Sequence, residues 1–232
     1  MKLKEREIEV PQSILVIGGT GHTGHSIVQK LKRHEYTARV LARDIESARK
    51  RFDADVEVVE GDITQEAGVA AAMRGVAGCV VVVESSDSNQ APNSPERVHY
   101  EGARNVLTAS AGHLVHIVLV SQIYITRPER YPEVRNVIHW RGQAEQALRA
   151  SGQLYTIVRP GWLTDEPGGR VALRFEQGDR GEGQVCREDV AEACVQSLLI
   201  PEAGGKTFEL YNVPGQPLQD WSSAFRALKA DA

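Results

Sequence analysis

Glycines near the start of the chain have the spacing of a phosphate-binding turn. Gly18, Gly21 and Gly24 follow one another at intervals of three residues. They come directly after the apolar run 14–17 and before a segment with the apolar periodicity of a helix. Glycine allows a tight turn and lets bare backbone approach a pyrophosphate, and the helix offers free N–H groups and a partial positive charge. Because strand, turn and helix come in the order that this motif requires, the segment predicts a dinucleotide site.

The end of the second predicted strand indicates which dinucleotide fits. An acidic residue there would bind the ribose 2′-hydroxyl, whereas an arginine favours a 2′-phosphate. Arg43 lies 19 residues after Gly24, which favours NADP(H) and leaves NAD(H) as the alternative. In that alternative Arg43 is a solvated charge and Asp44 is the functional acid, although Asp44 is equally suited to cap the next helix.

A further acidic residue follows the third predicted strand. The segment Gly61-Asp62-Ile63 is placed to meet the adenine, and Asp62 can accept a hydrogen bond from the adenine amino group. In the alternative interpretation, Asp62 caps the helix that is predicted to begin at Gln65.

Short apolar runs rich in Val and Ile alternate with segments of helical periodicity and would position these residues. Runs without strict polar alternation are typical of strands covered on both faces. The predicted strands are 14–17, 39–42, 56–59, 79–83, 116–120, 155–158 and 206–211, and the predicted helices are 23–34, 44–52, 65–74, 95–111, 137–151, 190–199 and 218–228. The alternation predicts an α/β fold, a doubly wound parallel sheet of six or seven strands in a Rossmann arrangement. Its ligand should lie beyond the carboxyl ends of the strands.

The pattern weakens at 123–136 and 162–184, where Pro, Gly and charged residues replace periodicity. Such segments are usually surface loops. Both follow predicted strands on the side where ligands bind, so we expect them to shape a substrate cleft. The chain 1–232 is then one domain with a small C-terminal cleft-forming region.

The composition excludes several classes of partner and site. The chain has 232 residues, with 27 Lys and Arg against 31 Asp and Glu, and its net charge of -4 gives no general attraction for nucleic acid or anionic lipid. Cys79, Cys186 and Cys194 lack the spacing of metal ligands, so no metal site is expected. No apolar run reaches the roughly 18 residues of a membrane span, and residues 1–10 lack the apolar core of a signal peptide. A cytoplasmic protein is therefore expected.

Several motifs together resemble a known family. They are Gly18-Gly19-Thr20-Gly21-His22-Thr23-Gly24, Gly61-Asp62-Ile63, Tyr100-Glu101-Gly102-Ala103-Arg104-Asn105-Val106, Ile117-Val118-Leu119-Val120-Ser121, Ser151-Gly152, Tyr155-Thr156-Ile157-Val158-Arg159-Pro160-Gly161 and Arg187-Glu188-Asp189-Val190-Ala191. Over about residues 12–215 the chain resembles the atypical short-chain dehydrogenase/reductases, in the NAD(P)-binding branch of flavin (biliverdin-IX-beta) reductase-like and NmrA-like proteins.

The resemblance implies a Rossmann fold with NADP(H) along the strand ends. It also implies which residues lie close to the cofactor, the last three near the nicotinamide: Thr20, His22, Thr23, Arg43, Asp62, Ser121, Pro160, Gly161 and Trp162.

The catalytic pair typical of that family is missing here. Its reductases use a Tyr and, four residues later, a Lys that holds the nicotinamide ribose and lowers the pKa of the Tyr hydroxyl. The matching positions hold Val137 and Arg141, and valine cannot transfer a proton. Arg141 shares an apolar stripe with Val137, so we expect it to hydrogen-bond the ribose hydroxyls. The alternative is an ion pair between Arg141 and Glu145 on a partly exposed face.

Other residues are candidates for the chemistry. Ser121, at the end of the fifth predicted strand, would polarise a substrate carbonyl, or would only satisfy local backbone groups. Tyr124 and Tyr131 are candidate replacement proton donors. A flavin, quinone or conjugated tetrapyrrole needs no protein acid, because it can take its proton from solvent. Elsewhere we expect a structural ion pair at Arg159 and a helix start at Asp189.

These observations favour an NADP(H)-dependent oxidoreductase that transfers hydride to a small conjugated acceptor. An alternative is a non-catalytic NADP(H)-binding regulator or redox sensor, which the loss of the Tyr and Lys supports. An epimerase or dehydratase of a nucleotide-linked sugar fits less well, because that class usually carries a large C-terminal substrate domain. Domains of this kind commonly form homodimers, although nothing in the helix faces indicates one.

Overall fold

The computed structural model describes residues 13–86 and 88–231, so the expectation for residues 1–10 lies outside the described part. Within it, an eight-stranded sheet has the order β3-β2-β1-β4-β5-β6-β10-β8, and only β8 runs antiparallel to its neighbour. The strands of this sheet are β1 (Ser13–Ile17), β2 (Thr37–Ala42), β3 (Glu57–Glu60), β4 (Gly78–Val81), β5 (His116–Val120), β6 (Tyr155–Pro160), β8 (Ala172–Glu176) and β10 (Lys206–Val213). The predicted doubly wound α/β fold is confirmed.

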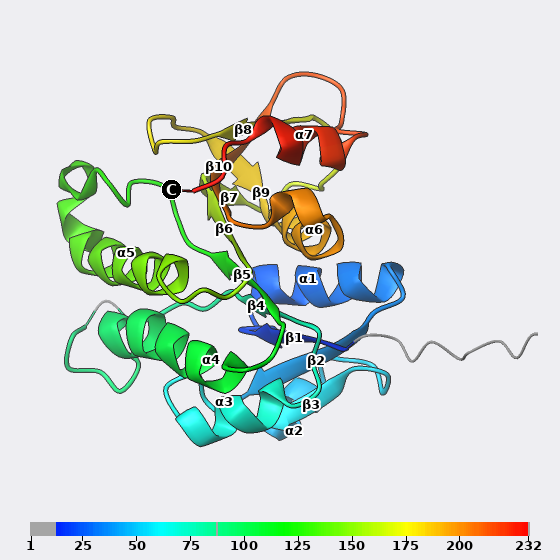
Figure 1. Cartoon of the computed structure of the whole chain (residues 1–232), viewed down its shortest axis with the longest axis vertical. Helices are drawn as coiled ribbons and strands as arrows, with labels where there is room; N and C mark the ends of the chain where they lie inside the picture. The colour runs from blue at the N-terminus through cyan, green and yellow to red at the C-terminus, as the bar shows by residue number, and fades with distance from the viewer. Residues whose placement is uncertain (1–12, 87, 232) are drawn as a thin grey trace, which may run out of the picture.

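Helices cover both faces of the sheet (Figure 1). One face carries α1 (His22–Arg33), α6 (Arg187–Leu199) and α7 (Trp221–Ala227). The other carries α3 (Glu66–Met73), α4 (Gly102–Ser110) and α5 (Arg135–Arg149), and the short α2 (Ile45–Arg49) follows β2. Side chains alternate along the central strand: Ile14 and Val16 pack towards α1, whereas Leu15 and Ile17 pack towards α3 and α4. A central strand covered on both faces needs apolar residues at successive positions, which is why the run at β1 is continuous.

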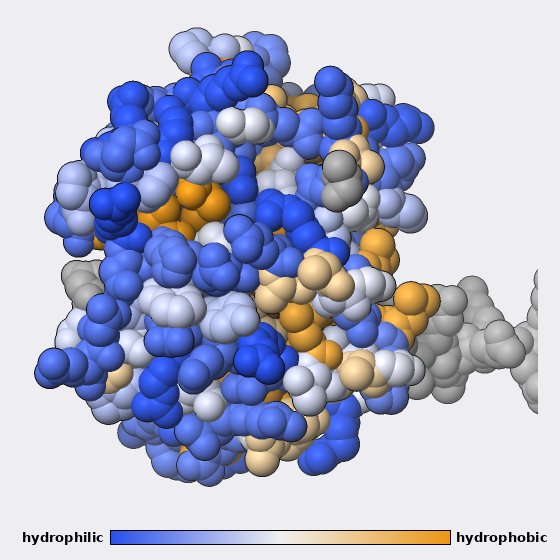
Figure 2. Space-filling view, turned by 60° about the vertical axis from the view of Figure 1, so that its left-hand side comes forward, coloured by the Kyte–Doolittle hydropathy of each residue, from blue (hydrophilic) through white to orange (hydrophobic). Residues whose placement is uncertain are grey.

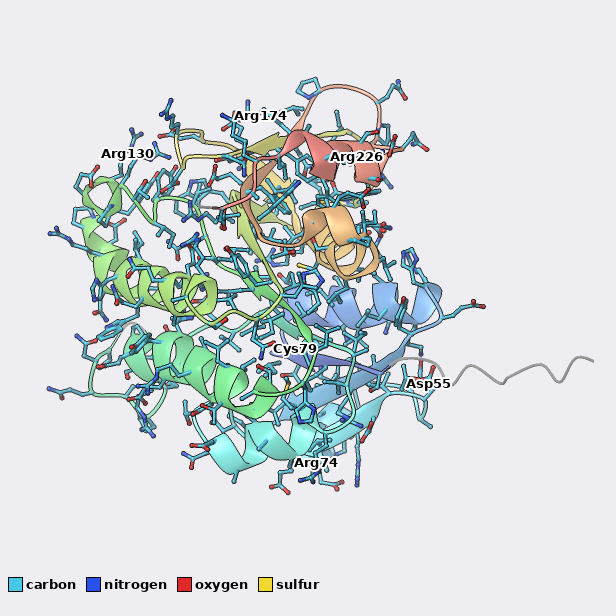
Figure 3. All side chains as sticks on the ribbon, viewed as in Figure 1. Asp55, Arg74, Cys79, Arg130, Arg174 and Arg226 are labelled. Atoms are coloured by element: carbon cyan, nitrogen blue, oxygen red, sulfur yellow. The ribbon has the colours of Figure 1, made fainter. Side chains whose placement is uncertain are left out.

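Most of the interior between the two helical layers is apolar. Cys79, on β4, is fully buried there and lies near the middle of the molecule (Figure 3), as expected of a core residue. The surface is different: the face drawn in Figure 2 is mostly hydrophilic, with apolar atoms in small separate groups. No helix in the described ranges is long and apolar enough to cross a bilayer. Nor do these ranges contain a cluster of His, Cys, Asp or Glu that could hold a metal.

The structure corrects some expected elements. Segment 162–184 is not only loop, because β7 (Trp162–Thr164) pairs with β9 (Gln184–Cys186) in a separate two-stranded sheet and β8 extends the main sheet beyond the expected seven strands. Segment 95–111 begins as a π-helix, Glu96–Glu101, before α4. Segment 123–136 is irregular as expected, with 3₁₀ turns at Pro128–Arg130 and Pro132–Val134. Another 3₁₀ turn, at Pro201–Ala203, follows α6.

Candidate active site

A cleft of about 250 Å³ opens at the carboxyl ends of β1, β2, β3 and β4. It brings together six of the predicted cofactor residues: Gly18, Thr20, Gly21, Arg43, Asp62 and Ile63. It also includes Glu84, Asn93 and Val98, which sequence reasoning did not identify. The predicted position of the ligand, beyond the strand ends, thus coincides with a cleft.

Two glycines of the turn have no room for a side chain. A Cβ on Gly18, which has φ of +91°, would lie 2.1 Å from the carbonyl oxygen of Val82. A Cβ on Gly24 would lie 2.1 Å from the carbonyl oxygen of Gly18. Helix α1 starts directly after the turn without a side-chain cap and without an acidic residue in its first turn. Its first N–H groups are therefore left for an anion.

Arg43 and Asp44 have separate roles at the end of β2. The carboxylate of Asp44 accepts a hydrogen bond from the amide of Ser47 at 2.9 Å and caps α2. Arg43 lines the cleft, is exposed, and makes no ion pair with any residue that the structure describes. The guanidinium is thus the charged group offered to a ligand at this strand end, and the carboxylate is already engaged.

Asp62 shapes the loop after β3. Its Oδ1 accepts a hydrogen bond from the amide of Thr64 at 2.9 Å. Helix α3 has its N-cap at Gln65, so the alternative in which Asp62 caps this helix is wrong. The carbonyl oxygen of Ile63 accepts a hydrogen bond from the side-chain amide of Asn105 at 2.8 Å, which fixes the loop against α4. Contact of Asp62 with an adenine stays a prediction.

A second cavity, of only about 10 Å³, adjoins the cleft, since Val83 lines both. Ser121 and Arg141 line it, as does His99, which sequence reasoning missed because an isolated histidine in a helix carries no signal. The Oγ of Ser121 is buried and, within the described residues, has no hydrogen-bond partner. His99 is buried, and burial and then the charge of Arg141 hold its pKa well below the usual range, so it is neutral.

Arg141 faces the strand ends and does not pair with Glu145. Its Nη1 donates to the carbonyl oxygen of Ser121 at 3.0 Å, and its Nη2 donates to both carboxylate oxygens of Glu84 at 2.9 and 2.8 Å. The alternative of an Arg141–Glu145 pair is therefore wrong. Glu145 is fully buried and instead binds Arg149 and Arg159.

Arg159 belongs to a buried structural network, as expected. Its guanidinium binds Glu145 at 2.6 Å and Glu209 at 3.0 Å, and both of these carboxylates are fully buried. Asp189 lies in the first turn of α6, also as expected, and its carboxylate additionally accepts from the amide of Gly169 at 2.7 Å.

Three aromatic residues gather beyond the ends of β5 and β6. The ring centroids of Tyr124 and Tyr131 are 4.6 Å apart, and those of Tyr131 and Trp162 are 5.2 Å apart. Trp162 is 49% exposed, whereas Tyr124 is buried. Burial, and then the neighbouring hydroxyl of Tyr131, raise the pKa of the Tyr124 hydroxyl to about 12. We refer to these three residues as the aromatic group.

The segment that ends β6 is held in place by close backbone packing. A Cβ on Gly161 would lie 2.5 Å from the carbonyl oxygen of Gly183, so this position needs glycine. The amide of Trp162 donates to the same oxygen at 2.9 Å. Pro160, Gly161 and Trp162 line neither of the two cavities just described.

Asp179 joins the two irregular segments and was missed by sequence reasoning. Its fully buried carboxylate accepts hydrogen bonds from the amides of Tyr124 and Thr126, each at 2.7 Å. The guanidinium of Arg127 lies 3.5 Å away. Segments 123–136 and 162–184 therefore form one unit beside the strand ends, although a Gly-Asp-Arg-Gly sequence by itself indicates only a turn.

Not every predicted cofactor residue has its side chain in the cleft. That of His22 lines a separate hollow of about 250 Å³ together with Arg51 and Asp165. That of Thr23 is buried in α1.

A family described as NAD(P)H-binding matches residues 18–201 of the chain. An uncharacterized chloroplastic protein of Arabidopsis thaliana is 32% identical over 93% of this chain and 75% of its own length. Sanguinarine reductase of Eschscholzia californica is 29% identical over 92% of this chain and 94% of its own. An NAD(P)H azoreductase of Xenophilus azovorans is 28% identical over 94% of this chain and 73% of its own.

Solved structures share the fold at low sequence identity. A putative NAD-dependent epimerase/dehydratase from Bacillus halodurans superposes with a TM-score of 0.79 at 21% identity, covering 94% of this chain and all of its own. A short-chain dehydrogenase/reductase from Veillonella parvula in complex with NADP has a TM-score of 0.71 at 17% identity, covering 90% of this chain and 98% of its own. At these identities the likeness shows the fold alone.

Proposed function

The chain belongs to the NAD(P)H-binding family, as its resemblance to the atypical short-chain dehydrogenase/reductases predicted, and from this premise we propose that it is an NADP(H)-dependent reductase of a small conjugated acceptor. The acceptor class is a flavin, a quinone or a similar planar molecule. The names of two relatives, a sanguinarine reductase and an azoreductase, support a reductase.

The observation that carries the proposal is the hydroxyl of Ser121, which has no hydrogen-bond partner in the part of the chain that the structure describes. Burying a hydroxyl without a hydrogen-bond partner destabilises the folded protein. Such an exception needs an explanation, and a hydrogen bond to a bound ligand is one. Ser121 lies at the carboxyl end of β5, and the cavity that it lines adjoins the cleft of the glycine turn. Its Oγ–H is free to donate to the acceptor atom on which negative charge develops during reduction.

Two features of the cleft support a dinucleotide with a 2′-phosphate. The bare turn and the uncapped N-terminus of α1 provide N–H donors for the pyrophosphate. Arg43, which forms no ion pair within residues 13–86 and 88–231, provides a guanidinium where the 2′-phosphate would lie, and Asp44 is occupied as a helix cap. NADP(H), when bound, supplies a hydride equivalent from its nicotinamide. The cavity beside Ser121, of about 10 Å³, is too small to enclose a nicotinamide ring, so Ser121 and Arg141 would contact the cofactor from this side only.

The lack of a proton donor at position 137 restricts the chemical class of the acceptor. Val137 is buried one turn before Arg141 and cannot donate a proton. Tyr124 is a poor substitute, since burial raises the pKa of its hydroxyl to about 12 and makes it a weaker acid. Hydride carries two electrons to the acceptor, and a proton from water completes its reduction. The acceptor must therefore stabilise the negative charge over conjugated atoms until the proton arrives.

The aromatic group offers a surface for such an acceptor. The strand order places β2 and β3 at one end of the site and β5 and β6 at the other. An adenosine near Arg43 would leave the reactive end of the cofactor near Ser121. The half-exposed Trp162 lies beyond the neighbouring strand and is supported from behind by Tyr131, which suits stacking of a planar ring.

The decisive experiment is turnover of NADPH with a panel of flavins, quinones and azo dyes, followed by the loss of NADPH absorbance. A reductase oxidises NADPH with at least one of these acceptors and does so much more slowly with simple aldehydes. Val137 favours a second candidate, a non-catalytic NADP(H)-binding regulator. That protein would bind NADPH and NADP⁺ but turn over none of the acceptors, which would contradict the proposal.

A further inference from the structure

Glu84 occupies the point where the cleft and the smaller cavity meet. It follows β4, lines the cleft, and directs both carboxylate oxygens at Nη2 of Arg141, at 2.9 and 2.8 Å. Its side chain is 76% exposed, whereas that of Arg141 is 11% exposed. The buried partner of this ion pair faces Ser121, and the exposed partner faces the cleft.

The ion pair between Glu84 and Arg141 contributes little to the stability of the fold. Arg141 has a separate anchor, since its Nη1 donates to the carbonyl oxygen of Ser121 at 3.0 Å. A pair with one partner this exposed is screened by water and adds little to stability. An acidic residue beside a site for a phosphate-rich cofactor would also weaken binding through repulsion. Neither fold stability nor electrostatic attraction to the cofactor phosphates therefore explains why Glu84 is at this position.

The chemistry of the pair suits a sugar diol. A carboxylate only accepts hydrogen bonds and can accept from two neighbouring hydroxyls, while a guanidinium only donates and can donate to the oxygens of the same hydroxyls. A dinucleotide that extends from Arg43 towards Ser121 must pass the pair. The parts of that dinucleotide that reach this point are a phosphate, which Glu84 repels, and the nicotinamide ribose, which offers two hydroxyl donors.

We propose that Glu84 is a cofactor-binding residue whose carboxylate accepts hydrogen bonds from the hydroxyls of the nicotinamide ribose, with Arg141 holding it in place. The proposal rests on the proposed function and deepens it. Glu84 and Arg141 together would fix the ribose in a chain that has valine where the related reductases have tyrosine. Arg141 would then bind the ribose jointly with Glu84, which follows β4.

The test is a titration of the full chain with two probes, NADPH and 2′,5′-ADP, each with wild type, Glu84→Gln and Glu84→Ala. The second probe carries the 2′-phosphate but lacks the nicotinamide ribose. We expect Glu84→Ala to weaken NADPH binding about tenfold or more, the loss typical of hydrogen bonds to a charged group, with a smaller loss for Glu84→Gln. The affinity for 2′,5′-ADP should not change in either variant.

A matched control is Glu57→Gln, which also removes an exposed acid from an ion pair, here with Arg39 at 2.7 Å. Glu57 opens β3 and lies at the other end of the strands from the cleft, so both affinities should stay as in wild type. Unchanged or tighter NADPH binding in both Glu84 variants would overturn the proposal, and so would equal weakening of both probes. If the wild-type protein binds neither probe, the proposed function itself fails. This outcome differs from failure of the Glu84 proposal, because it is seen with the wild-type protein and not only with the variants.

Discussion

The carboxylate of Asp179 accepts a hydrogen bond from the backbone amide of Tyr124, 55 residues earlier in the chain, at a distance of 2.7 Å. The same carboxylate accepts from the amide and the hydroxyl of Thr126. Tyr124 has φ of +71°, a conformation that is unfavourable for a tyrosine. The hydrogen bonds to Asp179 offset this strain and so set the position of the aromatic group.

Asp179→Ala should therefore destabilise the protein. The substitution leaves buried amide donors without an acceptor, which costs about 3 kcal/mol for a charged partner. Chemical denaturation measures this loss, and hydrogen exchange should become faster at the amides of Tyr124 and Thr126. Asp165→Ala is the control, because Asp165 is an exposed acid in an ion pair with Arg187 and its loss should cost less than about 1 kcal/mol. Equal stability of the two variants would contradict this account.

Arg43→Ala should lower the affinity for NADPH but not the affinity for NADH. Loss of charge-assisted hydrogen bonds to a 2′-phosphate, worth about 1.5–3 kcal/mol, should weaken NADPH binding about 10- to 100-fold and leave NADH binding unchanged. Fluorescence titration measures both affinities. Arg49→Ala removes another exposed arginine, which pairs within α2 with Glu46, and should change neither. Equal losses for NADPH and NADH would show that Arg43 does not read the phosphate.

Ser121→Ala should lower activity without lowering stability. The hydroxyl has no hydrogen-bond partner among the described residues, so its removal leaves no group unsatisfied and the unfolding free energy should not fall. Loss of a donor to developing negative charge should reduce kcat about a hundredfold. The measurement is kcat with the best acceptor of the panel, beside a thermal unfolding curve. An active variant would show that Ser121 is structural, and an unstable one would show that its hydroxyl has a partner in solution.

Local patterns were enough to predict which residues stand at the carboxyl ends of the strands. The glycine turn, Arg43 and Ser121 each stand at the end of an apolar run, and strand ends of a parallel sheet meet at one edge. Position along the chain therefore predicted position in space. The same reasoning placed the two irregular segments beside the strand ends, where Asp179 joins them.

Contacts between distant segments could not be predicted in this way. Glu84 follows a strand within a serine-rich stretch, and nothing local indicates its pairing with Arg141, 57 residues later. Spacing offered an ion pair between Glu145 and Arg141 only as an alternative, and helix α5 turns Glu145 inward to Arg159. Strand β8 lies in a stretch rich in Gly and Pro, and its antiparallel pairing with β10 depends on residues that follow much later. Pairings between residues so far apart in the sequence produce no pattern of apolar residues in either segment.

His116, at the start of β5, is expected to make stability depend on pH. Its Nε2 lies 2.9 Å from Oγ1 of Thr156, whose hydroxyl donates to the carbonyl oxygen of Ala203. Burial lowers the pKa of His116 from 6.5 to about 4, so the folded protein holds this ring neutral at neutral pH. His99 shifts in the same direction, again chiefly through burial.

Between pH 6.5 and about 4 the unfolded chain binds a proton at His116 that the folded protein does not bind, so the unfolding free energy should fall as the pH falls. The stabilising contribution is complete above pH 6.5, and His116 alone accounts for a loss of up to about 3 kcal/mol by pH 4. Denaturation across this interval measures the slope. His116→Gln keeps a donor for Thr156 but cannot titrate, so its slope should be shallower by about one proton. His113→Gln removes an exposed histidine and should keep the wild-type slope. A His116→Gln slope equal to that of wild type would mean that the ring is protonated in the folded protein.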